Sequence, residues 1–357
     1  MPIVPLYGHR ALRARLLDAL ARQALPASLL LHGPRGVGKQ RLALWLGQLL
    51  LCTGGGERPC GACTACRYAE SLTHPDLHWY FPRPRLKDAD PDLEDVVDDY
   101  REAIAERLKA DGLYPPPSGS EALFVATVRA ILQQVSMTPA FGARKVFVIG
   151  DAERMVAQEG ADAAANAFLK LLEEPPADTT LVLTSSEPGS LLPTIRSRVV
   201  SIRVPRLADA EVERFLADAR VAKAAGVKGG AGSRERVSAA AGAPGALLSD
   251  AVRGDAHAQA TRLLEAATAR DRAVLHATAL RQGVKSARGA FSDTLDALTV
   301  LLHDRARAAA SQGDERRASG AARAVEVVEE VKEMAAGNVN PQLATARLLR
   351  ELEELLR

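Results

Sequence analysis

The chain has 357 residues, too many for one ordinary domain, so two or three domains are expected. Hydrophobic residues make up 47% and charged residues 25%, a mixture typical of globular proteins that excludes wholesale disorder. The 46 basic and 44 acidic side chains leave a net charge of +2 (46 − 44), so no strong overall field attracts nucleic acid or membrane. Any contact with DNA must come from a local patch or from a surface that partner subunits complete.

The sequence contains no run of eighteen apolar residues, which excludes a membrane-spanning helix. The first residues, MPIVPLYGHRALRARLLDAL, lack the order of a signal peptide and predict a short segment that enters an amphipathic helix. We therefore expect a cytoplasmic protein with no membrane partner.

Short apolar runs alternate with helical stretches along the first two hundred residues. This alternation predicts an α/β fold, in which helices cover both faces of a parallel sheet. The strands are expected at Ser28–His32, Lys145–Ile149, Thr180–Thr184 and Val199–Arg203.

The segment GPRGVGKQ follows the first predicted strand and opens a helix, which is the setting of a P-loop. In such a loop, glycines at Gly33, Gly36 and Gly38 let backbone N–H groups turn toward phosphates. Lys39 can reach the terminal phosphates. A Ser or Thr normally follows the lysine and coordinates Mg²⁺, but the longer Gln40 is poorly suited to octahedral Mg²⁺. The sequence predicts a degenerate P-loop and leaves open whether ATP or ADP binds.

A second defect follows the strand Lys145–Ile149. After this strand, P-loop ATPases carry an Asp that holds Mg²⁺ through water and a Glu that positions the attacking water. Here Gly150 takes the first position and Asp151 the second. Shifting the register by one residue restores the Asp but leaves Ala152 in place of the Glu. In neither register do an Asp and a Glu both stand at the positions that the motif requires.

All cysteines of the chain, Cys52, Cys60, Cys63 and Cys66, lie within fifteen residues. A disulfide framework is not expected in the cytoplasm, whereas four thiolates are the number that a closed, structural zinc site takes. No His or carboxylate belongs to the cluster, so a catalytic zinc is not expected. The spacing differs from that of ferredoxin iron–sulfur sites, and thiols without a metal are the other interpretation.

Residues 83–121 interrupt the pattern of strands and helices. Acidic residues crowd the first half, at Asp88, Asp90, Asp92, Glu94, Asp95, Asp98 and Asp99. Apolar residues recur at helical spacing, at Leu93, Val97, Tyr100, Ile104 and Leu108. Three prolines at 115–117 then end the pattern. We predict an acidic amphipathic helix inserted into a loop, and the simplest role for it is surface decoration.

The strand pattern ends after Arg203. Residues 205–253 predict a short helical stretch, which is broken by Gly226, Gly229, Gly230 and Gly232. Residues 254–357 are rich in Ala, Arg and Leu and predict an all-helical part. Its last helix carries a leucine face, made of Leu343, Leu348, Leu349, Leu352, Leu355 and Leu356. That face needs a partner, either helices of the same domain or another subunit.

Four motifs follow one another along the chain: GPRGVGKQ, then CGACTAC with THPD, then NAFLKLLEEPP from Asn166, and IRSR from Ile195. In this order they resemble the delta-prime subunits of bacterial DNA polymerase III clamp loaders, a family within the AAA+ superfamily. The segment NVNPQL from Asn338 is similar to the start of the family's last collar helix. The resemblance spans nearly the whole chain.

The resemblance implies an AAA+ P-loop domain at residues 1–204, which includes a zinc module (52–66) and the acidic insertion (83–121). A helical lid at 205–253 and a helical collar at 254–357 would follow. The family forms a pentameric ring with delta and gamma/tau subunits, which opens the sliding clamp and places it on primed DNA. As part of such a ring, the chain would belong to the DNA polymerase III holoenzyme.

Ser197 and Arg198 match the family's Ser-Arg-Cys motif, with Val199 in place of Cys. The resemblance implies that Arg198 is an arginine finger, which stabilises phosphoryl transfer at the nucleotide of a neighbouring subunit. The simpler interpretation is that Arg198 pairs with a surface carboxylate. Active relatives also carry a lid Arg that touches the terminal phosphate, and Gly245 stands at that position. The segment 184–186 matches the family's polar sensor.

We expect a clamp-loader subunit without intrinsic ATPase activity, which acts as a stator and arginine-finger donor. A second hypothesis is an active AAA+ ATPase motor subunit of a clamp loader, which a complete set of nucleotide-site residues would have favoured. A third is a zinc-dependent DNA-binding protein with a relic P-loop. That protein would need basic and aromatic residues around the cysteines, but apart from Arg58, Arg67 and Tyr68 the surroundings offer none that stand out. The residues give no support for polymerase activity itself.

Overall fold

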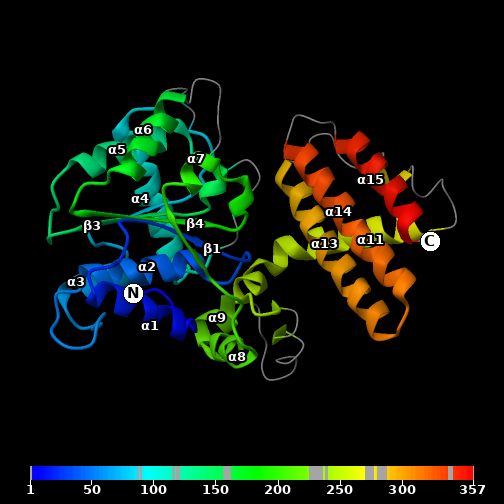
Figure 1. The fold of residues 1–357 in the computed structure, drawn as a ribbon, viewed down its shortest axis with the longest axis horizontal. Coiled ribbons are helices and arrows are strands. Elements are labelled where there is room, and N and C mark those ends of the chain that lie inside the picture. The colour runs from blue at the N-terminus through cyan, green and yellow to red at the C-terminus, as the bar shows by residue number, and fades with distance from the viewer. Residues whose placement is uncertain are drawn as a thin grey trace. The chain divides into compact units, whose positions relative to one another are not determined.

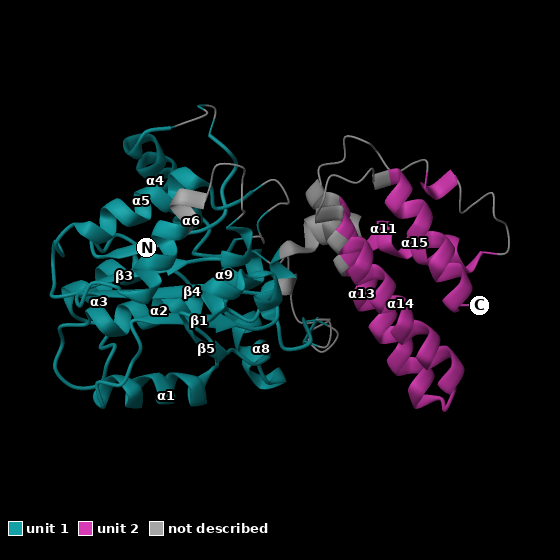
Figure 2. Ribbon diagram, turned by 45° about the horizontal axis from the view of Figure 1, so that its top comes forward, with its two compact units in different colours: residues 1–117, 121–249 teal, residues 118–120, 250–357 magenta. Residues whose placement is uncertain are grey.

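The computed structural model describes residues 2–86, 88, 91–114, 117, 121–155, 162–224, 236–237, 240–269, 277–279, 288–336 and 341–356. The chain divides into two compact units, the first made of residues 1–117 and 121–249 and the second beginning at Asp250 (Figure 2). No helix within the described ranges is both long and apolar enough to cross a membrane.

A five-stranded sheet forms the centre of the first unit, with the order β2-β3-β4-β1-β5 and parallel pairing throughout. The strands are β1 (Ser28–His32), β2 (Leu77–Tyr80), β3 (Lys145–Ile149), β4 (Thr179–Ser185) and β5 (Val200–Arg203). The predicted α/β fold is therefore confirmed, with β1 and β3 at the predicted bounds. Strand β2 was not predicted, because a run of four residues is too short to show a periodic pattern.

Helices cover both faces of this sheet. In Figure 1, α1 (Arg10–Ala21) and α2 (Lys39–Leu51) lie on one face, and α5 (Val125–Ser136) and α6 (Asp162–Glu173) lie on the other. Helix α2 is apolar nearly all round, because it packs against β3 and β4 on one side and α3 (Thr64–Glu70) on the other. Such two-sided cover is what buried parallel strands require.

The insertion is built into this core. The backbone of Arg83 pairs with that of Ala122 through two N–H···O bonds of 3.0 Å, which close the base of the insertion. Helix α4 (Leu93–Lys109) forms as predicted, starting at an Asp92 side chain that accepts the N–H of Asp95. Its buried valine is Val96 and not the predicted Val97. Val96, Tyr100 and Ala103 belong to the apolar core around the sheet, and the insertion is therefore more than surface decoration.

A smaller apolar cluster lies in the same unit around α8 (Asp209–Ala217) and α9 (Ala219–Ala224). Val212, Phe215 and Val221 pack there with Leu247 of the short helix η3 (Pro244–Ser249). The glycines at 226, 229, 230 and 232, which were predicted to break this stretch, lie outside the described residues.

The second unit is helical, as predicted. Its helices α11 (Asp250–Thr268), α13 (Arg288–Ser311), α14 (Glu315–Ala336) and α15 (Pro341–Leu356) pack as a bundle around one apolar core. On α15, Leu348, Leu349 and Leu352 are fully buried in that core. Leu343 is 68% exposed, so its assignment to the same face was wrong. The residues 338–340 of the collar motif lie outside the described residues.

Candidate functional site

The loops that follow β1, β3 and β4 meet at one edge of the sheet, because parallel strands share their carboxyl ends. The P-loop joins β1 to α2 there, and its Gly38 is the N-cap of α2 with φ 90°. Gly33 passes so close to the Val204 backbone that a Cβ would collide with the Val204 carbonyl oxygen. Only glycine fits at this position, and the loop is thereby held against the end of β5.

Lys39 is buried and is bonded to acceptors of its own chain. Its Nζ donates to the carbonyl oxygens of Gly33 and Pro34 and to Ser186 Oγ, each at 2.9 Å. Burial lowers the pKa of Lys39 to about 8, although the nearby carboxylates of Asp151 and Glu153 oppose that shift. The lysine that would contact phosphates is thus already bonded within the site.

Gln40 occupies the position beside Lys39 where P-loop ATPases hold Mg²⁺ through a Ser or Thr hydroxyl. Its Oε1 accepts the indole N–H of Trp79 at 2.9 Å, and its Nε2 donates to Asp151 Oδ2 at 2.8 Å. The neutral amide therefore bridges β2 and the end of β3. These residues do not fit a magnesium ion, because an amide N–H points at the carboxylate that a metal would need.

Gly150 leaves the space that Gln40 fills. A Cβ at Gly150 would lie 2.5 Å from Gln40 Cδ, which is closer than any real contact. An Asp at this position, as in an active ATPase, is incompatible with the observed Gln40 side chain. The two departures from the motif, Gln40 and Gly150, are thus coupled by packing, because the Gln40 side chain fills the space that Gly150 leaves.

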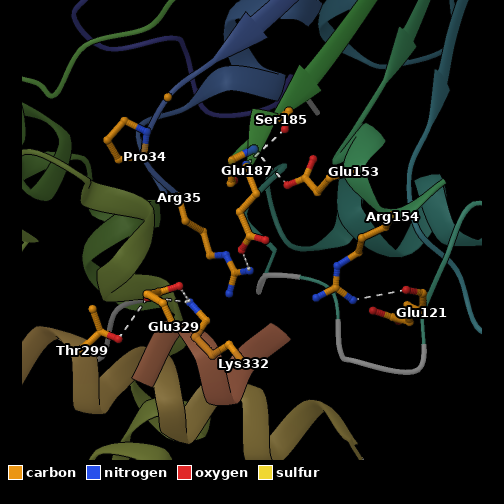
Figure 3. A network of polar contacts seen from close by, with 12 residues as sticks. Pro34, Arg35, Glu121, Glu153, Arg154, Ser185, Glu187, Thr299, Glu329 and Lys332 are labelled. Carbon is orange, nitrogen blue, oxygen red and sulfur yellow. Dashed lines mark hydrogen bonds and ion pairs between the residues drawn. The ribbon is translucent and has the colours of Figure 1, made fainter. Parts of the chain in front are cut away.

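Glu153, in the short helix η1 (Ala152–Arg154), belongs to the site although the sequence analysis did not name it. Its Oε1 accepts the Ser186 N–H at 2.9 Å, and Figure 3 shows it directed at the turn after β4. Burial, together with Asp151, raises the pKa of Glu153. Its place two residues after Asp151 is visible in the sequence, but the motif predicts a Glu directly after the Asp.

The turn after β4 also contacts the P-loop through an ion pair between Glu187 and Arg35. The Glu187 carboxylate lies 3.9 Å from the Arg35 guanidinium, and the Glu187 N–H donates to Ser185 Oγ at 3.1 Å (Figure 3). Together with the Lys39–Ser186 bond, these contacts fasten the sensor segment 184–186 to the loop. The segment lies where the sequence placed it, and its polar atoms are bonded to protein.

The backbone at Gly245 packs on the P-loop. Its N–H donates to the Gly36 carbonyl oxygen at 2.9 Å, and a Cβ at Gly245 would lie 2.9 Å from Gly36 Cα. No larger side chain fits here without moving one backbone or the other. An arginine side chain at this position therefore has no room in this arrangement.

The four cysteines converge on one point at the end of α2. Their Sγ atoms all lie within 4.8 Å of one another, and the pairs Cys52–Cys63 and Cys60–Cys66 are 4.0 Å apart. A tetrahedral site with metal–sulfur bonds of about 2.3 Å separates its sulfurs by about 3.8 Å. The residues thus fit a tetrahedral metal ion, and the cysteines form no disulfide.

Backbone N–H groups point at these sulfurs. The N–H of Cys63 donates to Cys60 Sγ at 3.3 Å, and the N–H of Cys66 donates to Cys63 Sγ at 3.4 Å. Burial opposes ionisation of Cys63, but hydrogen bonds from Cys66 and Thr53 prevail and lower its pKa to about 5. Burial raises the pKa of Cys66. The knuckle therefore favours thiolate at its turn, which is the form that binds metal.

Arg198 follows the short helix α7 (Pro193–Arg196) and is held by its own chain. Its Nε donates to Glu173 Oε1 at 2.6 Å, its Nη2 also pairs with that carboxylate, and its Nη1 donates to the Thr194 carbonyl at 2.9 Å. The pairing with a surface carboxylate, the simpler interpretation, is thus what the isolated chain shows. To act as an arginine finger, Arg198 would have to exchange its contact with Glu173 for one with a nucleotide.

Residues 8–208 match the family described as DNA polymerase III, delta subunit. The chain is similar to DNA polymerase III subunit delta' of Pseudomonas aeruginosa, with 35% identity over 177 residues, 49% of this chain and 42% of that protein. For subunit delta' of Bacillus subtilis, the identity is 31% over 183 residues, 51% and 43% of the two chains. The chain thus matches less than half the length of each relative.

More distant similarities extend to other proteins. DNA polymerase III subunit tau of Salmonella typhimurium is 30% identical over 201 residues, 56% of this chain and 25% of that protein. Among solved structures, a DNA polymerase III gamma subunit-related protein of Thermotoga maritima has a TM-score of 0.44 and 16% identity. That alignment covers 96% of this chain and 100% of the other.

The fit between Gln40 and Gly150 predicts a coupled pair of substitutions. Gly150→Ala should destabilise the first unit by about 1–3 kcal/mol, because the added methyl displaces the Gln40 amide. In a Gln40→Ser background the same change should cost little. Urea unfolding measured by tryptophan fluorescence tests this, since both tryptophans lie in the first unit. Gly189→Ala is the control, because a Cβ there meets nothing within 4 Å. Equal costs in both backgrounds would contradict the fit.

The cysteine cluster predicts about one metal atom per chain, lost on substitution. Cys63→Ser should release the metal and lower the unfolding midpoint of the first unit, because a structural metal contributes directly to folding. Elemental analysis of protein purified without chelators measures both the identity and the amount. Ala62→Ser, an exposed neighbour in the same turn, should keep the metal. If the wild-type protein contained no metal and were fully stable, the predicted metal site would be refuted.

Proposed function

This chain belongs to the DNA polymerase III delta subunit family, and we propose that it is a clamp-loader subunit that does not hydrolyse ATP. It would act as a rigid stator that helps to load the sliding clamp onto primed DNA during chromosomal replication. The observation that carries the proposal is the Gln40 side chain, which is bonded between Trp79 and Asp151 where an active P-loop holds Mg²⁺.

Hydrolysis needs a metal-holding carboxylate, a positioned water and cations around the transferring phosphate. Gly150 supplies no carboxylate, and Asp151 is bonded to the Gln40 amide. Gly245 packs on Gly36 and leaves no room for a lid arginine. A bound ATP or ADP would also have to displace Ser186 from Lys39. Together, these features support a subunit in which the residues of the nucleotide site are bonded to one another and do not hydrolyse ATP.

The second part of the proposal concerns Arg198. We infer that it is an arginine finger, which reaches the nucleotide of a neighbouring ATPase subunit in the assembled ring. Support comes from its place beside Ser197 in the motif and from its partly exposed guanidinium, 28% accessible on the side chain. In the ring, Arg198 would exchange Glu173 for a phosphate group, which is a stronger anionic partner for a guanidinium.

The remaining expectations belong to the same proposal. Similarity to delta' and tau subunits supports delta and gamma/tau subunits as partners in a pentameric ring, acting on the sliding clamp and primed DNA in the cytoplasm. Within the chain, we assign residues 1–204 to the P-loop domain, 205–253 to the lid and 254–357 to the collar. The metal would be a structural zinc, which suits four thiolates without a free coordination position.

The purified protein should hydrolyse ATP no faster than its Lys39→Ala variant, because the groups that bind Mg²⁺ are missing. A phosphate-release assay at saturating Mg²⁺ and ATP measures both. Since Lys39 has three protein acceptors, the variant's fold should be checked by its unfolding midpoint. Turnover by the wild-type chain that disappears in a folded Lys39→Ala variant would refute the stator role.

Arg198→Ala should leave the ring assembled and lower hydrolysis at the one neighbouring site that Arg198 faces. Arginine fingers contribute roughly 10³–10⁵ in rate where they act. In a ring with several active sites, total activity should therefore fall by a fraction only. Arg198→Lys should restore little, because an ammonium lacks the planar fork of donors. The measurement is DNA- and clamp-stimulated ATPase of rings whose assembly is checked by gel filtration.

Arg196→Ala is the matched control for this experiment. Arg196 lies two residues earlier and is exposed, so its loss removes one positive charge from the same surface. Rings with this variant should keep full activity. Full stimulated ATPase in an intact Arg198→Ala ring would leave Arg198 with only its structural contacts to Glu173 and Thr194.

A further inference from the structure

A strap of residues 2–7 precedes α1 and packs on both apolar clusters of the first unit. Ile3 and Val4 are neighbours in the sequence, and both are buried. Ile3 belongs to the core around the sheet, whereas Val4 belongs to the helical cluster around α8 and α9. Successive side chains of an extended chain point to opposite sides, so one short segment can reach two cores. None of the strap residues lies in a helix or a strand.

The strap is hydrogen-bonded to the helices that flank the P-loop. The Ile3 N–H donates to the carbonyl oxygen of Glu70, the last residue of α3, at 3.0 Å. Arg41, which follows Gln40 on α2, donates to the Val4 carbonyl oxygen from Nε at 2.7 Å and also from Nη2. Burial lowers the pKa of Arg41 to about 10, so the guanidinium keeps its charge at neutral pH. A charged donor makes a stronger hydrogen bond than a neutral one.

The strap is also bonded to the helical cluster. Arg220 of α9 donates from Nη1 to the Pro2 carbonyl oxygen at 3.1 Å, and the Tyr7 hydroxyl donates to Asp218 Oδ2 at 3.0 Å. The Tyr7 ring meets the ring of Phe215 on α8 edge to face, with 5.6 Å between the ring centres. The strap thus joins the helical cluster to α2 and α3.

The insertion fastens the strap from another side, through the insertion end (residues 111–114). The Asp111 carbonyl oxygen accepts the Val4 N–H at 2.8 Å. Gly112 has φ 74°, and a Cβ there would lie 2.7 Å from Ile3 Cγ2, so this close approach requires glycine. The insertion end therefore fits against the strap at the point where the strap passes from one apolar cluster to the other.

The last residues of the insertion end divide between the two clusters as the strap does. Leu113 packs against the helical cluster, and Tyr114 packs against the core around the sheet. Two segments from distant parts of the sequence thus pack on the same two clusters and are bonded to each other. They hold the helical cluster in addition to the bond between the Gly245 N–H and the Gly36 carbonyl oxygen.

We propose that the strap and the insertion end form a latch, which holds the helical cluster closed on the sheet and its flanking helices. In enzymes with lids, a bound ligand commonly drives closure, whereas this latch closes the cluster by contacts within the chain. The acidic insertion is then part of the latch. This inference rests on the proposed stator role, which needs a rigid chain. It is tested without ATP, so the latch and the stator role can fail separately.

Hydrogen exchange of the full, metal-loaded chain tests the latch, with mass spectrometry of peptides from α8, α9 and β4. Val4→Ala should speed exchange in α8 and α9 about tenfold, because it removes buried packing that opening of the cluster breaks. Tyr7→Phe keeps the ring and loses only the bond to Asp218, so it should fold and speed exchange in the same helices about fivefold. Wild-type exchange of α8 and α9 in the folded variants would overturn the proposal.

Val148→Ala is the matched control, because Val148 is fully buried in β3 and belongs to the core around the sheet. It should speed exchange in β4 and leave α8 and α9 as in the wild type, since the cluster opens while the sheet stays folded. Equal acceleration of all three elements in this variant would show that the cluster opens only when the whole unit unfolds, and the latch would then be excluded.

Gly112→Ala tests the part that the insertion plays. The added methyl collides with Ile3 and should speed exchange in α8 and α9 about tenfold. Gly56→Ala is its control, because Gly56 also has a positive φ, of 96°, but a Cβ there meets nothing within 4 Å. This control should leave α8 and α9 as in the wild type. A folded Gly112→Ala chain with wild-type exchange in both helices would contradict the proposal.

Discussion

The side-chain amide of Gln40 holds together the edge of the sheet where the P-loop lies. One end of the amide accepts the indole N–H from β2, and the other end donates to the carboxylate after β3. A Ser or Thr hydroxyl is too short to span these groups, and a carboxylate would repel Asp151. Gly150 makes room for the amide, since any side chain there would meet it. Three segments of the first unit, the start of α2, strand β2 and the turn after β3, are thus positioned by one neutral group.

Lys39 and one oxygen of Glu153 are likewise bonded within the chain, whereas the buried Glu153 Oε2 has no hydrogen-bond partner among the described residues. Lys39 is bonded to two carbonyls and Ser186, and Glu153 accepts the Ser186 N–H. Buried charges destabilise a protein unless they are paired or hydrogen-bonded, and here the pairing needs no ligand. The P-loop is thereby held by bonds within the chain, and Gly245 is bonded to it through the Gly36 carbonyl.

The contact between Arg198 and Glu173 orients the arginine in the isolated chain and is compatible with the proposed arginine-finger role. Glu173 is the last residue of α6, where the helix dipole disfavours a negative charge. The Arg198 guanidinium compensates that charge and also bonds the Thr194 carbonyl of α7. The arginine is therefore held near the surface in a defined orientation. An anion of a neighbouring subunit would compete with Glu173 for it.

The sequence by itself determined the features that depend on neighbouring residues. Continuous apolar runs identified β1 and β3, the spacing of Cys60, Cys63 and Cys66 identified the knuckle, and the losses at Gln40 and Gly150 were visible as departures from a motif. Only the tertiary structure decided what replaced the lost groups. Trp79 meets Gln40 across 39 positions of the sequence, and Asp151 meets it across 111. Such contacts depend on which side chains the packed sheet and insertion turn toward one another, and periodicity along the chain does not encode that direction.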